Sequence, residues 1–240
     1  MARRQQANAK AKGSDNGASG APRASYVDIA YQELKEQILQ NKMPAGYQAT
    51  EQELAEQLDM SRTPTREALI RLANEGLVEI RPRHGMRVLP ISAEDMREIY
   101  DILTSLESTA AGLVADKGLS DGEIAKLKGA VADMDDSLKK DDLVAWAEAD
   151  ERFHGLLLDY CGNSRIQALV NNFMDQSHRC RMLTLKLRPK PARSTADHAA
   201  VVDAISRRDA DEARRIHRQH RENSGALLIE LLKDFGLTQV

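Results

Sequence analysis

The chain has 240 residues, of which 42% are hydrophobic and 30% charged, and its formal net charge is −3. This composition is ordinary for a soluble protein, and sparse aromatic residues with plentiful Ala and Leu favour helices over sheet. No apolar run reaches the length of a membrane span, and the N-terminus lacks a signal-peptide core. We therefore expect a cytoplasmic protein with no membrane partner, whose two cysteines, Cys161 and Cys180, are free thiols.

Charge is distributed unevenly along the chain. Residues 1–24 hold five Lys or Arg against one Asp and show no apolar periodicity, so we expect a disordered tail. Residues 60–90 hold six Arg against three Glu, whereas the remainder is acidic. A mildly acidic protein can still bind DNA through such a basic surface, because the local field governs the encounter.

Residues 25–76 predict three helices, the last two in a helix-turn-helix arrangement. The first spans residues 25–41 and is capped by Ser25 and Asp28, and residues 50–53 form a capping box that opens the second. A break at residues 59–61 follows, with Ser61 as the N-cap of the third helix and Gly76 at its end. On that third helix, Arg62, Thr63 and Arg66 share a face that can meet the major groove of DNA.

Residues 77–89 predict a β-hairpin of the kind called a wing. Residues 77–80 and 86–89 have the composition of two short strands, and the basic turn at residues 81–85 joins them. We therefore place a winged helix-turn-helix domain at residues 25–91.

Residues 92–240 predict a second domain that is an all-helical bundle. Apolar residues recur at spacings of three and four from Met96 through Leu106 to Leu113, and again in residues 120–140. Further helices are predicted at about 141–160, 163–186, 194–207 and 209–234, and no strand signal follows residue 90. The predicted fold class is therefore mainly α.

Four polar residues lie on the apolar stripes of three of these helices: Asp150, His154, His198 and His220. A lone inward histidine is usually a satisfied core residue, but four such groups in one bundle are costly to bury without a shared partner. One carboxylate with three imidazoles suits a divalent ion such as Zn, Ni, Mn or Fe. His217 is the rival ligand on the last helix, and His178 is expected at the surface.

Residues 31–90 resemble the winged-helix domain of the GntR family of bacterial transcription regulators. The resemblance rests on the segments at residues 51–55, 61–69, 72–78 and 83–85. It implies that Arg62 and Arg66 contact the operator, with Ser61 and Thr63 beside them. It also implies that the wing tip at His84 and Gly85 reaches the neighbouring minor groove, and Arg83 beside it is a further DNA-binding candidate. The family usually has Arg where this chain has Gln52, so Gln52 is a further DNA-binding candidate with a different preference.

Residues 92–235 resemble the FCD ligand-binding domain of the FadR-like branch of that family. The segments at residues 150–154, 197–205 and 213–220 carry the resemblance. In metal-binding members these positions supply the ligands, and they are the four residues selected above. The family often places an Arg where this chain has Leu103, and that Arg helps to hold a carboxylate effector. Arg179 and Arg181 are the two candidates to replace it.

Together these features predict a homodimeric transcription regulator, a repressor or an activator, and not an enzyme. The winged helix would bind double-stranded operator DNA, and a small organic acid at the metal site would control operator affinity. Two alternatives remain at this point: a metal-dependent hydrolase that uses the Asp and three His residues, and a regulator whose metal is purely structural.

Overall fold

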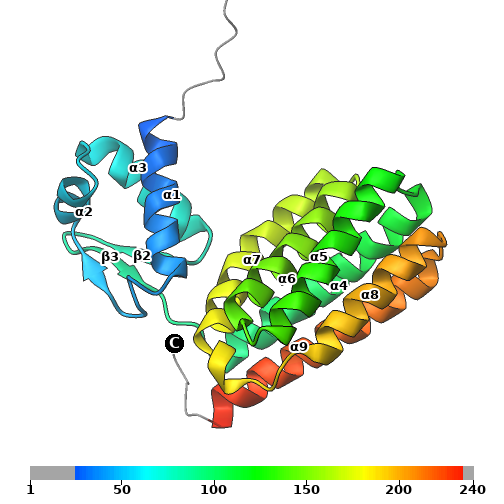
Figure 1. Ribbon diagram of the computed structural model, residues 1–240. Helices are drawn as coiled ribbons and strands as arrows, with labels where there is room; N and C mark the ends of the chain where they lie inside the picture. Colours follow the sequence, from blue (N-terminus) through cyan, green and yellow to red (C-terminus); the bar gives the residue numbers. More distant parts are fainter. Residues whose placement is uncertain (1–24, 235–240) are drawn as a thin grey trace, which may run out of the picture.

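The computed structural model describes residues 25–234, so the tail expected at residues 1–24 lies outside the described part. The described chain forms two lobes joined by a short connection, a winged helix-turn-helix and an all-helical bundle (Figure 1). The first lobe has the order α1 (Tyr26–Leu39), β1 (Gln48–Ala49), α2 (Glu51–Gln57), α3 (Arg62–Asn74), β2 (Val78–Arg81) and β3 (Gly85–Val88).

Capping boxes start α1 and α2 as predicted. Ser25 and Asp28 exchange side-chain and backbone hydrogen bonds at α1, and Thr50 and Glu53 do the same at α2. These bonds satisfy amide groups that a helix start otherwise leaves without partners. The first lobe's helices therefore begin where local sequence dictates.

Helix α3 begins where predicted, with Ser61 as its N-cap, but without the side-chain hydrogen bond that usually accompanies an N-cap. Ser61 has the extended backbone of an N-cap, but its side chain makes no capping hydrogen bond. The third residue of the helix is Pro64, which has no amide hydrogen to offer to a capping hydroxyl. Instead, the hydroxyl of Thr65 donates to the carbonyl oxygen of Ser61 at 3.1 Å. The end of α3 is as expected, with Gly76 just beyond it at a φ of +71°.

The wing is the outer part of a three-stranded antiparallel sheet with the order β1-β3-β2. The two predicted strands are present, each shifted by one residue, and Ile80 pairs with Met86. Strand β1 was not predicted, because two residues are too few to show an alternating pattern. It pairs Ala49 with Met86 and so joins the wing to the helix-turn-helix.

Gly85 is the first residue of β3 and not part of the wing tip, which corrects the sequence-based placement. Its φ is +79°, and a Cβ at this position would overlap the carbonyl oxygen of Ala49 and the Cα of Thr50. The wing thus depends on a residue without a side chain where the backbone of β3 meets the start of α2.

The second lobe consists of α4 (Ala93–Lys117), α5 (Asp121–Lys139), α6 (Leu143–Tyr160), α7 (Ser164–Leu183), α8 (Ala192–Ser206) and α9 (Ala210–Asp234), with a short 3-10 turn at Leu185–Leu187. Within residues 25–234, no helix combines the length and low polarity needed to cross a membrane. The apolar stripe of α4 differs from the prediction, because Leu106 and Leu113 are only half-buried. Glu107 lies inside instead, 2% exposed, since the face toward the bundle centre carries polar partners for it.

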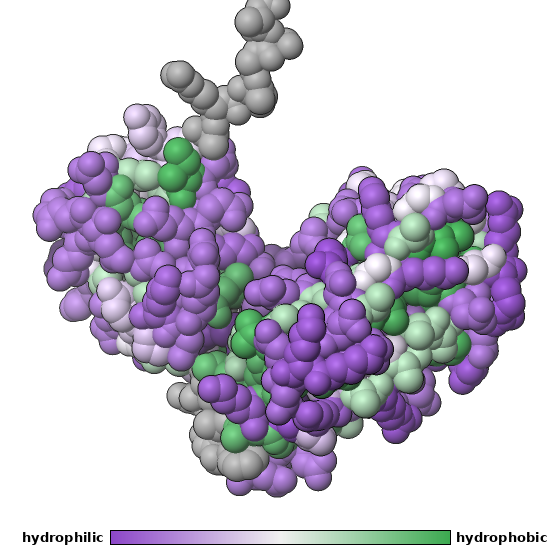
Figure 2. Space-filling model, viewed as in Figure 1, coloured by the Kyte–Doolittle hydropathy of each residue, from purple (hydrophilic) through white to green (hydrophobic). Residues whose placement is uncertain are grey.

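The two lobes have separate apolar cores, and polar contacts from α7 link them. Lys35 of α1 lies 2.6 Å from Asp175 and 3.0 Å from Glu75. Gln176 donates to the carbonyl oxygen of Glu75, and Arg179 donates to that of Leu89 at 2.8 Å. Figure 2 shows the lobes as two largely hydrophilic masses with a notch between them on one side.

His178, on the same helix, is half-buried and lies 3.1 Å from Glu151, so the expectation of a surface histidine was wrong. The first lobe partly covers this side of α7. The spacing of apolar residues within the bundle cannot show this, because the covering residues belong to the other lobe.

We predict that Gly85→Ala destabilises the protein more than Gly46→Ala does. Both glycines have positive φ, so both variants incur about 1–2 kcal/mol of backbone strain. Only Gly85 adds a steric overlap, because nothing lies within 4 Å of a Cβ at Gly46. Thermal melts of the two full-length variants measure the difference. Equal melting temperatures would show that β3 can move away from Ala49 without cost.

Candidate metal centre and DNA-reading surface

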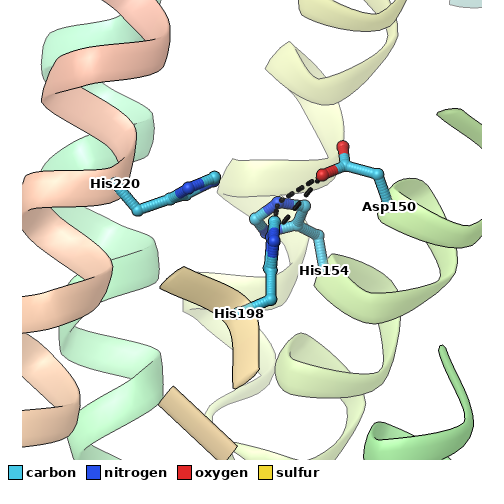
Figure 3. A group of neighbouring side chains, drawn as sticks. All are labelled: Asp150, His154, His198 and His220. Atoms are coloured by element: carbon cyan, nitrogen blue, oxygen red, sulfur yellow. Dashed lines mark hydrogen bonds and ion pairs between the residues drawn. The ribbon is translucent and has the colours of Figure 1, made fainter. Parts of the chain in front are cut away.

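The four sequence-predicted ligands meet in the middle of the bundle. Asp150 and His154 come from α6, His198 from α8 and His220 from α9, and their side chains point toward one another (Figure 3). One donor atom from each lies within 4.8 Å of every other, and all four residues are buried. Donors bound to one ion at about 2.0–2.2 Å lie at most about 4.4 Å apart, so the cluster is close to a ligand sphere.

The hydrogen bonds around two of the imidazoles orient their ε nitrogens inward. Nδ1 of His198 lies 2.6 Å from the carbonyl oxygen of Ser194, which can only accept, so Nδ1 holds the proton. Nδ1 of His154 lies 2.9 Å from Glu107, close but not aligned as a hydrogen bond, and the carboxylate again favours a proton there.

The two Nε2 lone pairs then face each other at 3.2 Å, and both face Asp150 Oδ1, at 3.8 Å from His154 and 3.5 Å from His198. Converging lone pairs repel, and a cation between them removes the conflict. The donor set therefore fits a divalent ion.

The protonation states in the cluster also suit a metal. Burial, followed by the charge of Arg221, holds the pKa of His154 well below its ordinary value, and burial with the nearby His220 lowers the pKa of His198 to about 3. Burial opposes ionisation of Asp150, but His154 and the fixed charge of Arg181 outweigh it and keep the pKa of Asp150 below its ordinary value. Neutral imidazoles and an ionised carboxylate are the forms that bind metals.

A buried ion pair between Glu107 and Arg221 lies next to His154 of the cluster. Arg221 of α9 donates to both carboxylate oxygens of Glu107, at 3.1 Å from Nε and 2.5 Å from Nη2. Both side chains are almost fully buried. Sequence analysis missed the pair, because charged residues on helices are usually solvated. The available signal was the position of Glu107, four residues after Leu103 and three before Ala110 on the inner stripe.

The rival ligand His217 lies beside Glu107 and His154. Its Nε2 is 3.7 Å from Glu107, and it groups with Glu107 and His154 instead of with Asp150. Arg221 already balances the charge of Glu107, so a second cation there would meet a guanidinium group at close range. The arrangement favours His220 over His217 as the fourth ligand.

A cavity of about 430 Å³ opens beside the cluster, with Asp150 and His220 in its wall. Arg181 also lines it and lies 2.5 Å from Asp150 Oδ2, whereas Arg179 is directed at the inter-lobe connection. Of the two arginines considered as replacements at the Leu103 position, Arg181 is therefore the one at the cavity. Arg188, which lines the same cavity, was not identified from sequence.

The side chains predicted to read DNA lie at the surface of the first lobe. Exposed residues are Gln52, Ser61, Arg62, Thr63, Arg66, Arg83 and His84, and Gly85 is half-buried. Most other arginines of residues 60–90 are engaged: Arg71 pairs with Asp28, and Arg81 and Arg87 pair with Glu79.

Within residues 25–234, the carboxylate that pairs with Arg62 and Arg66 is that of Glu51: Nη2 of Arg62 donates to it at 3.4 Å, Nε of Arg66 lies 3.8 Å from it, and both arginine side chains remain mostly exposed. No ion pair involves Arg83 within residues 25–234. These three arginines are thus the ones left available to an anionic partner.

Two family models match the chain. The model described as "Bacterial regulatory proteins, gntR family" matches residues 27–88, and the model described as "FCD domain" matches residues 98–223. The two matches fall on the winged lobe and on the bundle, respectively.

Similar proteins are described as HTH-type transcriptional regulators. An uncharacterized HTH-type transcriptional regulator of Agrobacterium vitis, from the TAR-I ttuE-ttuC' intergenic region, is 42% identical over 56% of this chain and 80% of its own. An uncharacterized HTH-type transcriptional regulator of Streptomyces ambofaciens is 32% identical over 82% of each chain. The HTH-type transcriptional repressor RspR of Escherichia coli is 26% identical over 79% of this chain and 83% of its own.

Solved structures share the fold. McbR/YncC of E. coli superposes with a TM-score of 0.74 at 20% identity, covering 87% of this chain and 99% of that one. A GntR-type regulator from Rhodococcus sp. RHA1 superposes with a TM-score of 0.68 at 19% identity, covering 86% and 99%.

We predict that Glu107→Ala lowers the free energy of unfolding by about 3–5 kcal/mol, because it leaves Arg221 buried without a counter-ion. Asp133→Ala is the matched control, since it removes one partner of the exposed pair between Asp133 and Arg152 and should cost at most about 1 kcal/mol. Chemical denaturation of both variants measures the two values. Similar losses would show that the buried pair contributes no more than a surface pair.

Proposed function

The chain belongs to the GntR family of bacterial regulatory proteins, and from this premise we propose that a small organic acid, bound beside a metal ion in the bundle, controls its affinity for operator DNA. The coarser function follows from the family: the protein is a DNA-binding transcriptional regulator. Its relatives are regulators and not enzymes, which removes the hydrolase alternative. We further propose the division into a DNA-binding domain at residues 25–91 and an effector domain at residues 92–240.

The DNA-reading role is proposed for the exposed N-terminal end of α3, with Ser61, Thr63 and Gln52 beside the two arginines. Arg62 and Arg66 are the observation that supports it, because both side chains are mostly exposed and pair only loosely with Glu51, so their forks of donors can exchange that carboxylate for guanine edges or phosphate. Arg83 and His84 are proposed to bring the wing tip to the minor groove, and Gly85 follows them as the first residue of β3.

A homodimer is the proposed binding form, because one winged helix reads too few base pairs for a specific site and symmetric dimers are the usual solution. The full chain should sediment as a dimer at micromolar concentration. If the chain sediments as a monomer at that concentration, two copies would associate only when they bind the operator.

The metal role is proposed for Asp150, His154, His198 and His220, supported by the converging lone pairs of His154 and His198. An ion held there borders the cavity, because Asp150 and His220 form part of its wall. Four protein ligands leave two positions of an octahedral ion for a carboxylate or hydroxycarboxylate. A purely structural metal is the competing function, and it predicts that no acid binds.

We predict that Arg62→Ala or Arg66→Ala weakens operator binding by about 1–3 kcal/mol each, with relaxed base preference at the contacted position. Arg71→Ala is the matched control, because Arg71 is on the same helix but pairs with Asp28 and stacks on Tyr31 at 3.9 Å. Gel-shift titrations at one salt concentration compare the three variants. Unchanged affinity in a variant removes that arginine from the reading surface.

We predict that His154→Ala loses bound metal and the response to small acids together, yet retains operator binding, because the winged lobe has its own core. His178→Ala is the control, since His178 lies outside the ligand cluster. Elemental analysis and gel shifts with and without hydroxy acids measure both properties. A full response in metal-free His154→Ala protein contradicts the coupling. Wild type that binds no acid and unfolds when stripped of metal supports the structural alternative.

A further inference from the structure

The cavity wall holds two neighbouring arginines that the metal cluster does not account for. Arg181, at the end of α7, is 8% exposed, and Arg188 follows the 3-10 turn and is half-buried. Nη2 of Arg188 donates to the backbone carbonyl oxygen of Arg181 at 3.0 Å, which holds the Arg188 side chain against the end of α7, and both arginines line the cavity. Burial, followed by the charge of Arg181, lowers the pKa of Arg188.

Three of the six guanidinium nitrogens on these arginines are buried and have no hydrogen-bond partner within residues 25–234. Arg181 uses Nη1 on Asp150, but its Nε and Nη2 are buried and bind nothing within residues 25–234, and the same holds for Nε of Arg188. Asn223, also in the cavity wall, has a buried Nδ2 in the same state. Buried donors without acceptors cost free energy, and all of these belong to residues around one cavity.

Charge around the cavity is unbalanced once a divalent ion is bound. The ion contributes two positive charges and the arginines two more, and Asp150 supplies a single negative charge if the imidazoles are neutral. Of the remaining charged residues in the wall, Lys190 and Arg193 balance Asp197 and Glu230. Arg221 is balanced by Glu107, which lies outside the wall. A monocarboxylate would leave two positive charges uncompensated in a partly enclosed site, whereas a dicarboxylate would leave one.

We propose that Arg181 and Arg188 form a second carboxylate-binding subsite, so that the effector is a short dicarboxylic acid. One carboxylate, with a neighbouring hydroxyl or keto oxygen, would bind the metal, and the other would accept hydrogen bonds from the arginine forks. This inference rests on the proposed function, because it assigns the far end of the same effector.

The experiment uses matched acids on metal-loaded full-length protein, with binding measured by calorimetry. Malate is compared with 2-hydroxybutyrate, and 2-hydroxyglutarate with 2-hydroxyvalerate. Both acids of a pair have the same 2-hydroxycarboxylate end to chelate the metal, and they differ at the other end, which is a carboxylate in the diacid and a methyl group in the monoacid. At least one diacid should bind roughly tenfold or more tightly than its monoacid partner, because the added bonds are to a charged group. Arg188→Gln should abolish that preference while metal content and the affinity for the monoacid are retained.

Lys186→Gln is the matched control, since Lys186 is an exposed cation on the same turn and does not line the cavity. Arg188→Lys tests whether the planar guanidinium group is needed. Lysine keeps the positive charge but lacks the forked pair of donors, so this variant should recover only part of the preference for diacids. Melting curves confirm that each variant is folded. Equal binding of diacids and monoacids overturns the subsite but leaves the metal-dependent effector function intact. A preference lost in Lys190→Gln and kept in Arg188→Gln also overturns it, and no binding of any acid overturns both proposals.

Discussion

The bundle is organised around one buried negative charge, that of Asp150. A carboxylate removed from water needs compensation, and here the guanidinium group of Arg181 on α7 supplies it, while His198 of α8 lies 3.5 Å from the carboxylate. Since these groups come from α6, α7 and α8, the charge of Asp150 links the packing of the three helices. Glu107 is a second buried carboxylate, and its counter-ion is Arg221. Glu107 lies next to Nδ1 of His154 and therefore leaves Nε2 of that imidazole to face Asp150.

Sequence analysis predicted the features that depend on local chemistry. Capping boxes at Ser25 and Thr50 and the break at Gly76 marked helix ends, and the 3.6-residue period put Asp150, His154 and His198 on inner faces. It failed where a partner distant in the chain decides the outcome. Examples are β1, which exists only by pairing with β3, and the half-buried His178 beside the first lobe.

The remaining omissions share one physical reason. Glu107, Arg188 and Arg221 are charged, and a single sequence gives no indication that a charged helix residue will find a partner more than one hundred residues away, as Arg221 does. Arg188 lies in an irregular segment, where no periodicity indicates the direction of a side chain. Glu107 could have been noticed from its position on the inner stripe of α4, but its partner and the role of Arg188 become visible only when the tertiary contacts are known.

Helix α7 contacts the buried carboxylate with Arg181 and the winged lobe with Asp175, Gln176 and Arg179, and all of those inter-lobe contacts are polar. Because the two apolar cores do not merge, turning one lobe against the other exposes little hydrocarbon and mainly exchanges ion pairs for water. Dissolved ions weaken such pairs just as they weaken contacts with phosphate. A turn of one lobe against the other on operator binding would therefore add its own salt dependence to that of counter-ion release from DNA, and the slope would then overcount the phosphates that are touched.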